Sequence, residues 1–127
     1  MLRSVFLALL LNLSVIGAVL AAGDHHHNRK HGGTVGETSG HHDVELVTDG
    51  QSMTLYVLHD DGELEKVTNA KATATILSGG KTEKIVLMPD GELLKGKGNV
   101  TVEKGDTIVI TLTMPGHKPE QARLKVN

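Results

Sequence analysis

The sequence predicts an all-β protein: an antiparallel, immunoglobulin-like β-sandwich of seven to eight short strands, with a small barrel as the alternative. From position 42 onward, apolar and polar residues alternate with the period of two that is typical of strands. Glycine turns such as Asp49-Gly50, Asp61-Gly62 and Asp90-Gly91 separate these segments at spacings of roughly 8–12 residues. No window favours a helix longer than a turn or two. Together these observations indicate a fold built from strands and tight turns.

Each expected strand is rich in β-branched or aliphatic residues and ends at a turn signal. In chain order the expected strands cover residues 43–48, 53–58, 70–77, 83–88, 93–94, 100–102, 107–113 and 121–126. The strongest is 107–113, which Pro115-Gly116 terminates. The expected core is aliphatic and consists of Val44, Leu46, Leu55, Val57, Ala72, Ala74, Ile76, Ile85, Leu87, Ile108, Ile110, Leu112, Leu124 and Val126.

Residues 1–23 have the layout of a cleaved signal peptide. Arg3 gives a positively charged start, residues 5–20 are mostly apolar, and the small residues Ala21, Ala22 and Gly23 precede a polar stretch. The apolar run is about 16 residues long, shorter than the roughly 20 that a transmembrane helix needs. We therefore expect export to a bacterial periplasm, with no stable membrane association after cleavage.

Residues 24–40 lack apolar periodicity and are rich in His and Gly, so we expect a disordered arm that precedes a β-domain over residues 41–127. The chain has no Cys, which excludes disulfides, thiolate catalysis and cysteine zinc sites. The net charge is −2 and there is no basic stripe, so no nucleic-acid partner is expected. The acidic residues lie mostly in turns, and no nucleophile motif is present. We therefore expect a protein that is not an enzyme.

Histidine is the unusual feature of the composition. Six of the eight His lie between positions 25 and 42, and imidazole is a common ligand for Zn, Cu and Ni. At the start of the first expected strand, alternation puts His42 with Val44 and puts His41 on the face of Asp43 and Glu45, a set suited to Zn(II). Solvated polar residues on an edge strand are the alternative explanation. The candidate metal ligands are His25, His26, His27, His31, His41, His42 and Glu45.

The position of cleavage decides whether a second kind of metal site exists. Cleavage after Ala22 or Gly23 leaves a histidine at the third position of the new chain, and cleavage after Ala21 does not. A free amine, two backbone amides and a third-position imidazole supply four nitrogens in a plane, which suits Cu(II) or Ni(II). His59, at the end of an expected strand, is interpreted as a turn residue. Met114 lies near His117 in the sequence, and core packing explains this methionine better than a copper site does.

Several short motifs occur together: His31-Gly32-Gly33, then His42-Asp43-Val44-Glu45-Leu46, then Asp60-Asp61-Gly62 and Ser78-Gly79-Gly80. In this the chain resembles a family of small exported bacterial β-domains. It is also similar to the extra N-terminal domain of periplasmic adaptor subunits of heavy-metal efflux pumps. The resemblance implies a periplasmic β-domain near metal-resistance systems, with His31 and His42 as metal contacts and Glu45 as a weaker candidate. The chain departs from the adaptors in lacking their other domains, which leaves a free-standing metal binder or carrier, or a domain kept for another use. The resemblance names a heavy-metal efflux system as the candidate partner.

Two functions follow from the sequence. The first is a periplasmic protein that binds Zn, Cu or Ni through N-terminal histidines and buffers or delivers the ion in metal homeostasis or resistance. The second is a non-catalytic β-sandwich module for protein interaction, with an incidental His-rich tail.

Overall fold

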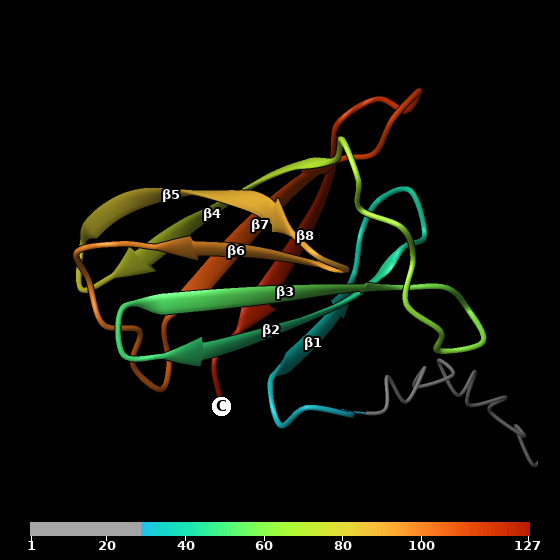
Figure 1. The fold of residues 1–127 in the computed structure, drawn as a ribbon. Helices are drawn as coiled ribbons and strands as arrows, with labels where there is room; N and C mark the ends of the chain where they lie inside the picture. Colours follow the sequence, from blue (N-terminus) through green and yellow to red (C-terminus); the bar gives the residue numbers. More distant parts are fainter. Residues whose placement is uncertain (1–28) are drawn as a thin grey trace, which may run out of the picture.

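The computed structural model describes residues 29–127, and these form eight strands (Figure 1). The predicted signal peptide and His25, His26 and His27 lie outside the described residues. In the part of the chain from 29 to 127, there is no helix of the length and hydropathy that a membrane span requires. The strands are β1 (Thr34–Glu37), β2 (Asp43–Asp49), β3 (Ser52–Leu58), β4 (Lys71–Ser78), β5 (Lys81–Asp90), β6 (Leu93–Lys97), β7 (Thr107–Thr113) and β8 (Glu120–Lys125).

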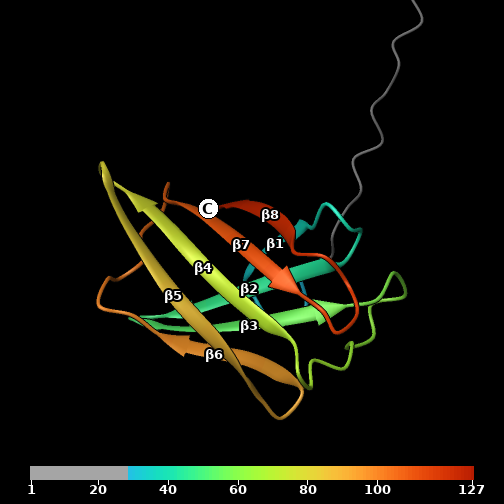
Figure 2. The ribbon, with the colours of Figure 1, turned by 90° about the horizontal axis from the view of Figure 1, so that it is seen from above.

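All strand pairs are antiparallel, and the eight strands form one sheet in the order β1-β2-β3-β6-β5-β4-β7-β8. The sheet curls until its two edge strands, β1 and β8, lie side by side, so that it is nearly closed like a barrel. Figure 2 shows β4, β5 and β7 crossing over β2 and β3. Closure between β1 and β8 depends on close packing, because Gly36 lies against Leu124 so tightly that a Cβ would be 2.4 Å from Leu124 Cδ2.

The predicted all-β, antiparallel class is confirmed. The strand order describes a single curled sheet, so the finer detail of an immunoglobulin-like sandwich stays a prediction, and the near-closure corresponds to the barrel alternative. The turn glycines lie where the sequence predicts them: Gly50, Gly62 and Gly91 all have positive φ angles of 58–83°. Residues that carry a Cβ atom rarely adopt positive φ angles, so glycine is favoured at these turns.

Two segments differ from expectation. Residues 34–37, expected in the disordered arm, form β1, which pairs with β2 through Thr34↔Leu46 to Glu37↔Asp43. This segment is only four residues long and contains a glycine, so it shows no clear alternation. Pairing with β2, which is rich in apolar residues, orders it. Residues 100–102, expected as a strand, lie in irregular backbone between β6 and β7.

The core lies between the facing strands and is aliphatic, as expected. Of the predicted core residues all are buried except Val126, which is partly buried and packs against the core. Buried methionines contribute too: Met53 and Met114 are 2% and 4% exposed. Met114 is therefore a core residue, in agreement with the packing explanation of the Met114–His117 pair.

Candidate functional site

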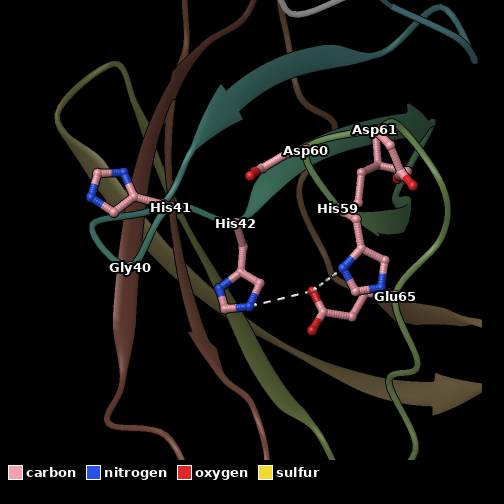
Figure 3. Close-up of a pocket in the computed structure, with 8 residues that line it drawn as sticks. Gly40, His41, His42, His59, Asp60, Asp61 and Glu65 are labelled. Carbon is pink, nitrogen blue, oxygen red and sulfur yellow. Dashed lines mark ion pairs between the residues drawn. The ribbon is translucent and has the colours of Figure 1, made fainter.

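A pocket opens at one end of the barrel, where the turn between β1 and β2 meets the loop after β3 (Figure 3). Its lining is unusually rich in groups that bind metals or protons. It is lined by Gly40, His41, His42, Leu58, His59, Asp60, Asp61 and Glu65. His117, in the loop between β7 and β8, and Glu120, at the start of β8, lie against His42.

His42 is held in place by a buried carboxylate. Its Nδ1 lies 2.6 Å from Oε2 of Glu120, and its side chain is only 14% exposed. The same carboxylate oxygen accepts a hydrogen bond from Thr38 Oγ1 at 2.8 Å, and Thr38 Oγ1 accepts one from the His42 amide at 2.9 Å. Gly40 permits this arrangement, because a Cβ there would be 2.2 Å from the Glu120 carboxyl group. With Nδ1 engaged, the Nε2 atom is the one His42 presents to the pocket.

The Nε2 atom of His42 faces a second carboxylate. It lies 3.3 Å from Oε2 of Glu65, and His59 Nδ1 lies 3.9 Å from the same oxygen, so that Glu65 stands between two imidazoles (Figure 3). That oxygen is buried and has no hydrogen-bond partner among the described residues. The Glu65 backbone is fixed by its amide, which donates to Val57 O at 2.8 Å. The pocket therefore gathers two imidazoles around one carboxylate oxygen that no hydrogen bond satisfies.

The electrostatics of the site favour ionised Glu120. Burial by itself would raise the pKa of the Glu120 carboxyl. Hydrogen bonds from His42 and Thr38, together with the charges of His42 and His117, outweigh burial and hold this pKa below its ordinary value. The His117 ring approaches His42 edge-on, with ring centroids 5.9 Å apart. Glu120 is thus a fixed negative charge behind the His42 ring.

The alternation on which the placement of His41 with Asp43 and Glu45 depended does not extend to His41, and its role as a metal ligand stays a prediction. The residue precedes β2 and has a positive φ of 68°, so the alternation of the strand does not extend to it. Its side chain is 85% exposed, and its Nδ1 lies 2.5 Å from Glu37 Oε1. His41 borders the pocket, but its ring is paired outside it.

Glu45, predicted as a weaker candidate for a metal ligand, has both carboxylate oxygens engaged in contacts within the protein. The side chain is completely buried, and its two oxygens accept hydrogen bonds from the amides of Lys30, His31 and Gly33 and contact His31 Nδ1 at 3.0 Å. Burial would raise the pKa of the Glu45 carboxyl, but these bonds, Gly33 foremost, outweigh it and hold the pKa low. The physical role of Glu45 is to bind the backbone of residues 30–33.

The predicted ligands His31 and His42 therefore belong to two separate places. His31 contacts Glu45 and stacks on Tyr56, with ring centroids 3.7 Å apart and ring planes 11° apart. His42 contacts Glu120 and Glu65 in the pocket. Within residues 29–127, no three His, Asp or Glu side chains are grouped closely enough to hold a metal ion as they stand.

Sequence reasoning missed Glu65 and Glu120 and treated His59 as a turn residue. For Glu120 a signal exists: the inward alternation of β8 runs from Leu124 through Ala122 to Glu120, which puts a carboxylate on a core-facing position. Glu65 carries no such signal. It lies in the irregular segment between β3 and β4, and only the folded chain brings it to His42.

Comparison of the chain with protein-family models, with curated proteins and with solved structures found no match.

Proposed function

We propose that this protein binds a divalent metal ion, Zn, Cu or Ni, at the His42 pocket, and that it buffers or delivers this ion in a bacterial periplasm. The observation that carries the proposal is the imidazole of His42, which Glu120 holds at Nδ1 while its Nε2 faces Glu65 Oε2. A ligating histidine in metalloproteins is commonly held in this way, with its other ring nitrogen on a carboxylate.

The distance between the two facing atoms supports a metal of zinc size. Ligand atoms about 2.0–2.1 Å from a tetrahedral Zn(II) are separated from one another by about 3.3–3.4 Å. The separation of His42 Nε2 and Glu65 Oε2 is 3.3 Å. His59 Nδ1 lies 3.9 Å from the same oxygen, about half an ångström beyond this spacing, and is the candidate for a third ligand.

The openness of the pocket supports exchange of the ion rather than a structural role. Structural zinc sites are closed by four protein ligands, and the described residues supply fewer than three in place. An incompletely filled coordination sphere leaves positions for water or for a ligand from a recipient protein. Buffering or delivery, in homeostasis or alongside a heavy-metal efflux system, is the role that suits such a site.

The test is calorimetric titration of the processed protein, recovered after export of the precursor, with Zn(II). Zn(II) is chosen because a third-position histidine at the new N-terminus would take up Cu(II) or Ni(II) independently of the pocket. We expect one equivalent to bind with sub-micromolar affinity, which corresponds to more than about 8 kcal/mol. The variants His42→Asn and Glu65→Gln should each weaken this binding at least tenfold.

His41→Asn is the matched control, because it removes the neighbouring imidazole and asparagine tolerates the positive φ at this position. Its affinity should stay within about twofold of the parent, the scatter expected of a residue outside the site. Weak, multi-site binding that is indifferent to His42 would refute the proposal and favour the alternative, a non-catalytic interaction module with an incidental tail.

A further inference from the structure

The outward face of four neighbouring strands carries basic side chains and, in its aligned rows, no acidic one. Strands β5, β4, β7 and β8 are adjacent in the sheet, and directly opposite residues of an antiparallel pair project to the same side (Figure 2). The register therefore aligns the outward side chains in three rows across the four strands. The first row is Thr82, Leu77, Thr107 and Lys125, the second is Lys84, Thr75, Val109 and Arg123, and the third is Val86, Thr73, Thr111 and Gln121.

The acidic residues of these strands lie elsewhere. Glu83 and Glu120 alternate with the outward residues and project to the opposite side. Glu83 accepts a hydrogen bond from the Asn99 amide at 2.8 Å. Asp90 lies beyond the rows, at the end of β5, and its Oδ2 is 3.2 Å from Lys95 Nζ. No carboxylate of these strands therefore neutralises the rows.

We define the cationic face as the three rows together with Lys71 and Thr113, which pair with each other at the next outward position of β4 and β7. Its basic residues are all exposed, and among the described residues none of them forms an ion pair. They are Lys71, Lys84, Arg123 and Lys125. The whole chain has a net charge of −2, so this face concentrates positive charge on a protein that is otherwise acidic.

Two large apolar side chains lie beside these cations. Val86 belongs to the third row, and Met88 follows it on the same side of β5. They are 57% and 62% exposed. Exposed apolar residues that occur singly need no explanation. Two of them beside unpaired cations combine the two kinds of contact, apolar and electrostatic, that bind proteins to anionic lipid surfaces.

The composition of the cationic face is unlike that of a protein interface. It has no aromatic residue, and threonine and lysine, two of its main components, are under-represented in the parts of protein interfaces that carry the binding energy. Hydroxyl and ammonium groups can instead donate hydrogen bonds to phosphate oxygens, and a fluid layer of headgroups requires no fixed complementary shape. The threonines are Thr73, Thr75, Thr82, Thr107, Thr111 and Thr113.

We infer that the cationic face binds reversibly to a phospholipid surface with anionic headgroups. The four basic side chains contact phosphate groups, and Val86 and Met88 enter between the headgroups. The contact is peripheral, unlike the stable membrane association that the sequence argues against. The inference is independent of the proposed metal site, because the cationic face shares no residue with the lining of the pocket.

The experiment is co-sedimentation of the processed protein with lipid vesicles, with a chelator present so that metal ions do not bridge protein and phosphate. One set of vesicles contains phosphatidylglycerol mixed with phosphatidylcholine, and the other contains phosphatidylcholine alone. We expect binding to the first set at about 0.1 M salt and at least tenfold weaker binding at about 1 M salt, because the Debye length falls from about 10 Å to about 3 Å. Vesicles of phosphatidylcholine alone should bind at least tenfold more weakly.

The variant Lys84→Gln/Arg123→Gln should weaken binding to the anionic vesicles at least tenfold, since each basic residue near such a surface contributes about fivefold. Lys66→Gln/Lys97→Gln is the matched control. It makes the same change in net charge at exposed positions outside the four strands. Its affinity should stay within about twofold of the parent, because charges more than a Debye length from the lipid are screened. Equal losses in the two variants would overturn the inference.

Val86→Ser/Met88→Ser tests whether the partner is a bilayer. This variant should bind anionic vesicles several-fold more weakly than the parent and bind soluble polyphosphate as the parent does. If the variant binds both like the parent, the face takes a soluble polyanion or an acidic protein, and the inference is overturned. Equal binding of the parent to the two sets of vesicles would overturn it as well.

Discussion

Two buried glutamates do the structural work of fixing the two histidines that the motifs single out. Glu120 holds His42 and Thr38, and Glu45 holds His31 and the backbone beside it. Each carboxylate is ionised at neutral pH, because hydrogen bonds outweigh the effect of burial on its pKa. The histidines near these glutamates thus differ from His41, whose ring is exposed and unattached to the barrel interior.

Acid should weaken the fold through these two groups. A carboxyl group whose pKa is lower in the folded state than the ordinary value of about 4.5 contributes stability above that value, and the contribution is lost as pH falls through the folded pKa. We expect the free energy of unfolding, measured by urea titration, to decline below about pH 4.5.

At pH 7, Glu120→Gln should lower the free energy of unfolding by about 1–3 kcal/mol and reduce its dependence on acid pH. Glu92→Gln, at an exposed turn position, is the control and should leave both quantities unchanged. A Glu120→Gln protein with the stability and the acid sensitivity of the parent would contradict the assignment.

Among the elements, β5 shows most clearly how alternation divides a strand between core and solvent. It pairs with β4 along most of its length and with β6 at its end. Leu87 is fully buried, whereas Val86 and Met88 on the opposite face are 57% and 62% exposed. The same strand therefore offers a buried and an exposed side chain of similar size at adjacent positions.

We expect Leu87→Ala to lower the free energy of unfolding by about 2–5 kcal/mol, because it leaves a cavity in a close-packed interior. Met88→Ala is the matched variant and should change stability by no more than about 0.5 kcal/mol. Denaturant unfolding of the two proteins in parallel measures the difference. Equal effects would mean that β5 is not in the register of the structure.

At the scale of the whole molecule, the strands differ in how many neighbours they are hydrogen-bonded to. β4 and β7 lie inside the sheet and are paired on both sides. β1 is paired with β2, and no ladder joins it to β8 in the described chain. At this junction Ser39 N donates to Gln121 O at 2.9 Å, beside the Thr38–Glu120 contact. The junction is thus held mainly by packing and by the groups behind the pocket.

Hydrogen exchange should report this difference. Amides of β4 and β7 should exchange most slowly, near the rate of global unfolding, and amides of β1 fastest among the strands. Saturating Zn(II) should slow exchange at residues 38–42, because an ion on His42 binds the folded state only. If β1 is as protected as β7 without metal, the junction between β1 and β8 is stronger than packing alone accounts for.

The alternation of residues and the turn glycines determined the all-β class, the seven strands from β2 to β8 and the aliphatic core, because these depend on local pattern and on burial of one face of each strand. The histidine-rich composition predicts a metal site, and that stays a prediction. Tertiary structure decided the rest. It ordered β1 through pairing, enclosed Glu45 within the backbone of residues 30–33, and brought Glu65 and Glu120 to opposite nitrogens of His42. The residues in these contacts lie up to 78 positions apart in the sequence. A local sequence pattern does not show that residues so far apart will be in contact.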